Sequence, residues 1–201
     1  MKTRERILMT TLDLYNEMGV YNVSSRVICK EMNISPGNFS YHFPSMSRLV
    51  TELFGRYVEK ISSLSQDTDS ITDYVYEKFK FMKIQYDYRF LFLNLFDITQ
   101  KHEGIKDLLL IKDQEQLQTE KKLLNQLSKN FYLKANLSEQ QLNSLATTNM
   151  RAFRSWLVEA MLYEDNDALD LRPYLSYCIQ AVLALLSLKG IREIKQTGIM
   201  V

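Results

Sequence analysis

The stretch SPGNFSYHF, residues 35–43, carries small and hydrogen-bonding side chains whose types and spacing suit the surface of DNA. The amide of Asn38 can both donate to and accept from the N6/N7 edge of adenine. Gly37 and Ser40 are small, so they would let the protein backbone approach a duplex closely. These residues therefore indicate contact with base edges in a major groove.

Donors for phosphate groups occur in the same region. Tyr41, His42 and Arg26 can each donate to a phosphate oxygen. Pro36 stands where a helix would begin, and the free backbone N–H groups of a helix N-terminus favour phosphate. Taken singly, each of these residues is more often an ordinary solvated helix residue. Their ordered combination favours the DNA-contact interpretation over that alternative.

Local signals predict two helices in front of this stretch. Residues 7–18 repeat apolar side chains three and four apart, and Gly19 stands where that pattern stops. Ser24 can cap a second helix of about two turns. Asn33 tolerates the left-handed conformation that a tight turn needs, so the second helix should end there.

The stretch itself reads as a third helix. Ser35 offers an N-cap and Pro36 the favoured first helical position. Phe39 and Phe43 are four residues apart and fall on one face, which can anchor the helix to its neighbours. Ser45 can cap a fourth helix that follows Pro44. Two short helices joined by a tight turn, the second presenting polar residues, form a helix-turn-helix pattern.

The run TRERIL…LDLYNEMG…NVSSRVICKEMNISPGNFSYHFPSMSRLV resembles the N-terminal DNA-binding domain of TetR-family transcriptional regulators over about residues 3–54. The resemblance implies an all-α chain of about nine helices, with a helix-turn-helix head at 1–46 and a larger ligand-binding and dimerisation domain at 47–201. It also implies a homodimer that binds a palindromic operator. The predicted DNA contacts are Ser25, Arg26, Ser35, Pro36, Gly37, Asn38, Ser40, Tyr41, His42 and Arg48.

The chain departs from the family pattern at two of the positions that bear on DNA. Met46 stands where a lysine commonly opens the fourth helix and binds a phosphate, so that contact is lost or passes to Arg48. Ser40 stands where a tyrosine is frequent, which would alter base preference rather than abolish binding.

Composition excludes several other classes of protein. The chain has 201 residues, 46% of them hydrophobic, with six glycines and three prolines, which favours a folded all-α protein. The net charge of +1 does not by itself indicate a nucleic-acid partner. Cys29 and Cys178 flank no metal-binding motif, so we expect no metal and no cofactor. No long uncharged apolar run or secretion signal is present, which predicts a cytoplasmic protein without a membrane partner.

Aromatic residues concentrate after the first third of the chain. Residues 74–96 hold nine of them, more than one packing face requires. They form either a thick bundle core or the wall of an apolar pocket for a hydrophobic small molecule. The predicted pocket residues are Phe79, Met82, Tyr86, Phe92, Phe96, Phe153 and Trp156.

The remaining sequence predicts long helices. Residues 106–132 form a charged amphipathic segment in which Asp113, Gln116 and Glu120 should leave one side wet. Ser138 and Gln141 form a possible capping box. A loop or short helix is expected at 164–173, after which Pro173 can start the last major helix and Gly190 can close it.

An apolar stripe lies on each of the last two long helices. The resemblance to TetR proteins implies that these helices pair with their copies in a dimer, and the alternative is that the stripes are buried inside one chain. The predicted interface residues are Leu145, Asn149, Phe153, Ile179, Val182, Leu183 and Leu186.

These observations favour a ligand-responsive transcriptional regulator, with repression as the expected sign. In a second hypothesis the body docks a protein partner, which the charged face of residues 112–129 suggests. An enzyme or lipid carrier is disfavoured, because the sequence offers no Ser/His/Asp set, phosphate loop or nucleotide motif.

Overall fold

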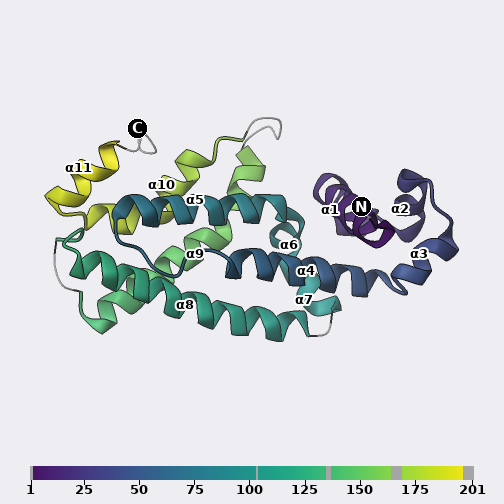
Figure 1. The fold of residues 1–201 in the computed structure, drawn as a ribbon, viewed down its shortest axis with the longest axis horizontal. Coiled ribbons are helices and arrows are strands. Elements are labelled where there is room, and N and C mark those ends of the chain that lie inside the picture. The colour runs from purple at the N-terminus through teal and green to yellow at the C-terminus, as the bar shows by residue number, and fades with distance from the viewer. Residues whose placement is uncertain (1, 103, 135–136, 164–168, 197–201) are drawn as a thin grey trace. The chain divides into compact units, whose positions relative to one another are not determined.

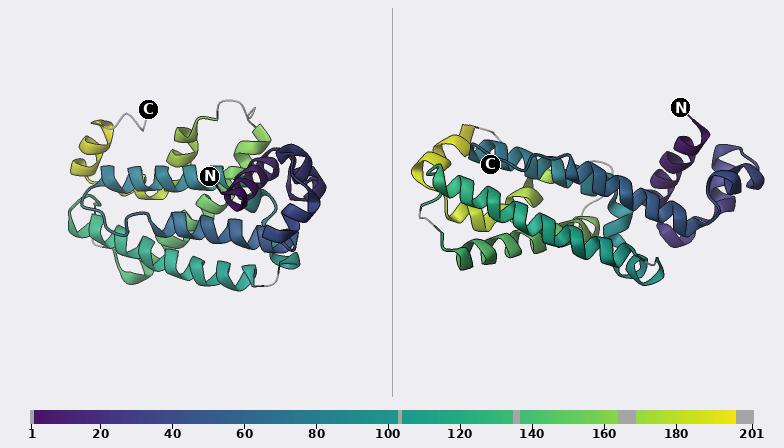
Figure 2. Two further views of the ribbon diagram at one scale, coloured as in Figure 1. Left: turned by 45° about the vertical axis from the view of Figure 1, so that its right-hand side comes forward. Right: turned by 60° about the horizontal axis from the view of Figure 1, so that its bottom comes forward.

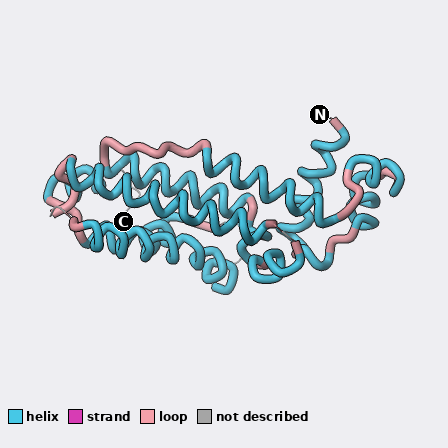
Figure 3. The backbone as a smooth tube through the Cα atoms, turned by 90° about the horizontal axis from the view of Figure 1, so that it is seen from below, coloured by secondary structure: helices cyan, strands magenta, loops and turns pink. Residues whose placement is uncertain are grey.

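The computed structural model describes residues 2–102, 104–134, 137–163 and 169–196. Over these residues the chain forms eleven α-helices and one short 3-10 helix, with no strand beyond an isolated bridge between Leu133 and Leu186 (Figure 3). The all-α prediction is confirmed. Contacts divide the chain into two compact units, residues 1–62 with 85–109 and residues 63–84 with 110–201.

The first unit begins with the predicted helix-turn-helix (Figure 1). Gly19 adopts φ 80° at the end of the first helix, and Asn33 adopts the left-handed conformation, φ 53° and ψ 48°, at the tight turn. Gly19 was predicted as the glycine at the end of the helical pattern, and Asn33 from its tolerance of the left-handed conformation. The elements are α1 Thr3–Met18, η1 Val20–Asn22, α2 Ser25–Met32 and α3 Pro36–His42.

Three further helices lie wholly within this unit, namely α4 Met46–Ser62, α6 Arg89–Leu93 and α7 Leu95–Lys101. The amide N–H of Arg48 donates to Ser45 Oγ at 3.2 Å, which confirms the predicted cap of α4. The rings of Tyr15 and Phe90 lie 5.2 Å apart between α1 and α6. Asn16 of α1 reinforces that contact, because its side chain accepts from the amide N–H of Phe90 and donates to the carbonyl of Asp87.

The second unit is a helical bundle whose core includes the fully buried Trp156. Ser138 and Gln141 form the predicted capping box, each side chain accepting from the backbone N–H of the other. Helices α9 and α10 lie side by side (Figure 2). The helices are α5 Ile71–Asp87, α8 Ile105–Lys129, α9 Glu139–Tyr163, α10 Leu171–Ala184 and α11 Leu188–Gln196, of which the last residues of α5 and the first of α8 belong to the first unit.

The last helices begin and end at other residues than the sequence indicated. Helix α10 begins at Leu171 rather than Pro173, because the Asp170 side chain accepts from the backbone N–H of Arg172 at 3.0 Å and caps it earlier. Gly190 lies inside α11, where an added Cβ would stand 2.7 Å from the carbonyl oxygen of Tyr132. That glycine therefore permits close packing instead of ending a helix. Of the loop or short helix predicted at 164–173, residues 164–168 lie outside the described residues.

Candidate nucleic-acid interface

Helix α3 has one buried face and one exposed face. Ser35 Oγ accepts from the backbone N–H of Asn38 at 3.2 Å, so the predicted N-cap is present. Phe39 and Phe43 are buried with their ring centroids 6.3 Å apart, and they anchor the helix as predicted. The opposite face carries Asn38 and the 84% exposed ring of Tyr41.

Gly37 lies on the exposed side of α3, and nothing inside the chain requires a glycine there. A Cβ at this position would meet only Ser35 Oγ, at the ordinary contact distance of 3.9 Å. A glycine within a helix lowers stability by up to about 1 kcal/mol relative to alanine. The small residue is therefore explained better by a partner that approaches α3 than by the packing of the chain itself.

Basic side chains flank α3 on both neighbouring helices. Arg26 on α2 and Arg48 on α4 are exposed and form no ion pair within the described residues. Met46, where the family commonly has lysine, is half-buried and offers no charge. Of the ten residues predicted to contact DNA, Ser25 and His42 are half-buried and the other eight are exposed: Arg26, Ser35, Pro36, Gly37, Asn38, Ser40, Tyr41 and Arg48.

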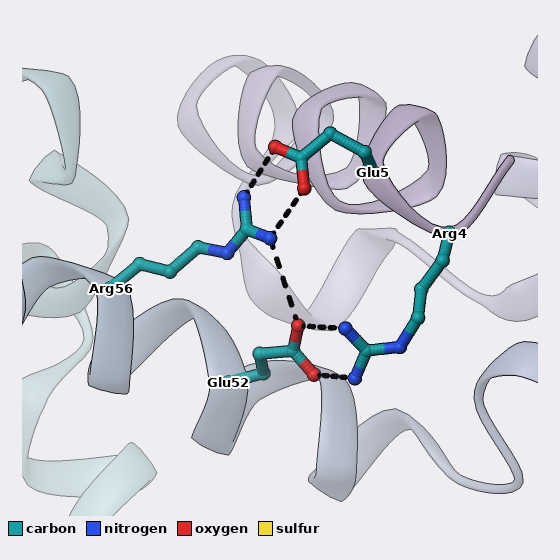
Figure 4. Close-up of polar contacts among 4 residues, drawn as sticks. All are labelled: Arg4, Glu5, Glu52 and Arg56. Atoms are coloured by element: carbon teal, nitrogen blue, oxygen red, sulfur yellow. Dashed lines mark hydrogen bonds and ion pairs between the residues drawn. The ribbon is translucent and has the colours of Figure 1, made fainter. Parts of the chain in front are cut away.

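An ion-pair network that the sequence reasoning missed ties α1 to α4 (Figure 4). The guanidinium of Arg56 donates to both oxygens of Glu5 at 2.6 and 2.5 Å, and the guanidinium of Arg4 donates to both oxygens of Glu52. Arg56 also lies 3.8 Å from Glu52, which joins the two pairs. The hydrogen bonds from Arg56 hold the pKa of Glu5 below its usual range.

The same network reaches α3, because Arg4 Cζ lies 5.0 Å from the centre of the Phe43 ring. The complementary pairs Arg4-Glu5 and Glu52-Arg56 on two adjacent helices were the signal in the sequence that could have revealed it. The network therefore links α1 and α4 to the residue that ends α3.

The end of α7 makes two further contacts, one with the start of α4 and one with η1. Ser47 Oγ at the start of α4 lies 2.9 Å from His102 Nδ1, and Lys101 Nζ lies 3.9 Å from the centre of the Tyr21 ring. Burial lowers the pKa of His102, and the nearby ammonium of Lys101 adds to that effect. The imidazole at this contact is therefore held in its neutral form at physiological pH.

The predicted pocket residues separate into buried and exposed positions. In the second unit Met82, Phe153 and Trp156 are buried, and Phe153 meets Phe81 with ring centroids 5.6 Å apart. Phe79 in that unit is half-buried beneath Lys83. In the first unit Tyr86 and Phe92 are half-buried, whereas Phe96 is 76% exposed.

A buried polar cluster lies beside those rings in the second unit. Glu120 on α8 is 3% exposed, so the prediction that it lies on a wet side was wrong. Its Oε1 accepts from the Tyr74 hydroxyl at 2.6 Å and from Asn149 Nδ2 at 3.0 Å, and its Oε2 accepts from the Lys78 ammonium. Burial raises the pKa of Glu120, but the Lys78 charge and these hydrogen bonds outweigh burial and hold it below its usual range.

Most residues predicted for a dimer interface are buried against other parts of the same chain. Asn149 belongs to the buried polar cluster, and Leu183 alone of the seven is half-buried rather than buried. The other five, Leu145, Phe153, Ile179, Val182 and Leu186, lie in the core. The five core side chains leave little free area for a second chain, whereas Leu183 keeps part of its surface exposed. Exposed apolar side chains on these two helices are Val158, Leu162, Tyr163 and Tyr177.

Across the residues that the structure describes, no group of three or more His, Cys, Asp or Glu side chains could hold a metal ion. In the same part of the chain, no helix is long and apolar enough to cross a bilayer.

The fold and the exposed face of α3 define a helix-turn-helix DNA-binding protein. A family model for TetR, described as a bacterial transcriptional repressor, matches residues 53–187. The chain belongs to the TetR family of transcriptional regulators. Members of this family are regulators that bind DNA and act as dimers, rather than enzymes.

A curated relative matches only part of the chain. The HTH-type transcriptional regulator UidR of Escherichia coli K12 is 30% identical over 88 residues, a match that covers 38% of this chain and 45% of UidR. The chain therefore spans less than half the length of this curated relative.

Solved structures match the fold over more of the chain. A TetR-family regulator from Marinobacter aquaeolei VT8 has a TM-score of 0.87 at 18% identity and covers 100% of both chains. A putative transcriptional regulator from Saccharomonospora viridis in complex with choline has a TM-score of 0.68 at 17% identity, covering 92% and 97%. SmeT in complex with triclosan has a TM-score of 0.65 at 14% identity, covering 94% and 93%.

Proposed function

We propose that this chain is a cytoplasmic, ligand-responsive repressor that binds a palindromic operator as a homodimer. Residues 1–46 form the DNA-binding head in this proposal, and residues 47–201 form the ligand-binding and dimerisation domain. The observation that supports it most is the exposed face of α3, where the Asn38 amide and a glycine that the fold does not need face outward. Asn38 reads adenine, and Arg26 and Arg48 neutralise phosphates on either side.

The dimer surface consists of the exposed apolar side chains near the end of α9, together with Tyr177 on α10. Leu162 is 71% exposed, and Val158 lies one turn before it on the same helix. Such side chains lose unfavourable contact with water when two copies meet. Two heads held in this way would read half-sites about one helical turn, roughly 34–36 Å, apart.

An effector then acts by binding better to the conformation whose heads are wrongly spaced, which lowers operator affinity. The complexes of the two similar structures with choline and with triclosan support a small molecule as that effector. Control by a protein partner is less well supported, because charged residues of α8 are engaged inside the chain. Asp113 pairs with Arg154 at 2.5 Å, and Lys122 pairs with Asp67 at 2.7 Å.

Binding to the DNA that flanks the gene tests this function. Fluorescence anisotropy should show that the chain prefers a palindrome from that region to a scrambled duplex of the same length, by about a thousandfold or more. Asn38→Ala should weaken binding by about 1–3 kcal/mol, and the loss should be confined to sequences with the contacted base pair. Equal affinity of the wild-type chain for the palindrome and the scrambled duplex would rule the proposal out.

A further inference from the structure

The side-chain amide of Asn149 has an acceptor without a partner in the middle of the second unit. Asn149 is 1% exposed, and its Oδ1 atom forms no hydrogen bond. The orientation of the amide is fixed chemically, because its other end lies 3.0 Å from Glu120 Oε1, and an ionised carboxylate only accepts. The nitrogen must therefore face Glu120, and the oxygen must face away from it.

None of the hydrogen bonds formed by the neighbours of Asn149 reaches that oxygen. The Tyr74 hydroxyl already donates to Glu120 and accepts from Asn149 Nδ2 at 3.1 Å. Both carboxylate oxygens of Glu120 are acceptors in use. Lys78 is the neighbour with donor capacity left, because an ammonium has three N–H groups and one of them binds Glu120.

Aromatic rings lie around the Lys78 ammonium, which shares Glu120 with Asn149. Phe153 lies one turn after Asn149 on α9, and the Lys78 ammonium lies 5.8 Å from the centre of its ring and 5.1 Å from that of Tyr74. Phe81 meets the Phe153 ring edge to face. A buried water usually makes about three hydrogen bonds, and here it would find one free acceptor and one ammonium between aromatic rings. A molecule with a polar end and an apolar body matches these groups better than water.

Asn149 Oδ1 and the Lys78 ammonium determine which polar group the ligand should carry. A hydroxyl can donate to Asn149 Oδ1 and, through its lone pairs, accept from the Lys78 ammonium. The charges of Lys78 and Glu120 cancel, so a ligand with a net charge would leave an uncompensated charge in a buried place. A neutral hydroxyl compound satisfies both conditions.

We infer that Asn149 and Lys78 form the polar end of the effector site, and that the effector is a neutral aromatic molecule bearing a hydroxyl group. The aromatic body packs against Phe81 and Phe153, and its hydroxyl donates to Asn149 Oδ1. This inference rests on the proposed ligand-responsive function and specifies the ligand class. It also explains why a polar residue lies within the apolar stripe of α9.

Four probes with one aromatic body test the inference by calorimetry on the full chain. They are p-ethylphenol, its methyl ether p-ethylanisole, the anion p-ethylbenzoate and the cation p-ethylbenzylammonium. The ether keeps an acceptor for Lys78 but cannot donate to Asn149. We expect the phenol to bind about tenfold more tightly than the ether, and both charged probes to bind more weakly than the phenol.

Variants on α9 then assign the preference to Asn149. Asn149→Leu should reduce the preference for the phenol to within about twofold, because the acceptor is gone. Asn143→Leu is the matched control, an exposed asparagine on the same helix, and should keep the full preference. If the circular dichroism spectrum shows that the Asn149→Leu chain does not fold, the relative affinities of the wild type for phenol and ether still test the inference, because that comparison needs no variant.

Three results would overturn the inference: equal binding of phenol and ether by the wild type, tightest binding of a charged probe, or an Asn149→Leu chain that folds and keeps the preference. Absence of binding by all four probes would also overturn it and would leave a buried water as the partner of Asn149. Operator binding measured without probes on the same preparations separates the two ideas. Specific DNA binding with no phenol preference removes the ligand class alone, whereas loss of specific DNA binding removes the proposed function.

Discussion

At the scale of single residues, Gly37 and Gly55 make an informative pair. Both lie in helices of the first unit, and neither has a neighbour that an added Cβ would crowd. Gly37 is on the exposed face of α3, whereas Gly55 lies in α4, away from the predicted DNA contacts. Packing within the chain therefore requires neither glycine, and only Gly37 lies on the surface proposed to meet DNA.

Alanine at Gly37 should have opposite effects on stability and on DNA binding. We expect Gly37→Ala to raise the free energy of unfolding by up to about 1 kcal/mol, because alanine loses less backbone entropy in a helix. Operator affinity should fall by about tenfold or more, since the added methyl group prevents close approach of the backbone. Urea denaturation and anisotropy measure the two quantities. Gly55→Ala should stabilise similarly and leave affinity unchanged; a similar loss of affinity in both variants would contradict the assignment of Gly37 to the interface.

Residues with local signals were predicted well. Ser35 and Asn33 act through the backbone within a few positions of themselves, so their roles as cap and turn can be read from nearby sequence. Glu120 could not be read in this way, because its partner Lys78 is 42 residues away on another helix. A charged residue on a charged helix predicts solvent exposure unless the fold brings a counter-charge to it.

At the scale of helices, the Lys78 and Glu120 pair joins α5 to α8. Lys78→Met should lower the free energy of unfolding by about 3 kcal/mol, because it leaves a buried carboxylate without its counter-charge. Lys80→Met on the same helix is the control and should cost much less, since Lys80 is more exposed and pairs with Glu77 on its own helix. Denaturation by urea at neutral pH compares the two variants, and equal losses would show that burial of the pair is not what matters.

The pH dependence of the same variant should reverse in sign. In the wild type the pKa of Glu120 is lowered in the folded state. Its contribution to stability is therefore full above the unfolded carboxyl value, about 4.3, and is lost as pH falls through the folded value. Without Lys78, burial should raise that pKa, so the variant should become more stable as pH falls through the raised value.

The sequence alone does not predict which helix faces pack within the chain and which remain exposed. The apolar stripe on α9 predicts burial, but the same stripe would serve burial within one chain or between two. The structure places Phe153 and its neighbours on the stripe inside the second unit. The exposed residues beyond it, such as Leu162, could not be singled out, because which face of a helix meets its own chain depends on contacts far apart in sequence.

At the scale of the whole molecule, the proposed function requires two chains to act together on one operator. Leu162→Glu should convert the dimer to a monomer, because it introduces a charge into the proposed apolar contact. Operator affinity should then fall by about a hundredfold or more, since the second head no longer benefits from the binding of the first. Sedimentation velocity and anisotropy measure the two effects. Leu188→Glu, at a similarly exposed leucine on α11, should leave both unchanged, and a wild-type chain that sediments as a monomer would refute the proposal.

The ion pairs between α1 and α4 also bear on how DNA affinity should respond to ionic strength. Salt weakens DNA binding because phosphate contacts release counterions, and the slope is normally used to count those contacts. In this chain salt also screens Arg4, Glu5, Glu52 and Arg56, which are partly exposed and join α1 to α4. The slope of DNA affinity against salt concentration therefore contains a contribution from these ion pairs as well as from the phosphate contacts. A count of phosphates taken directly from it would exceed the number that the protein contacts.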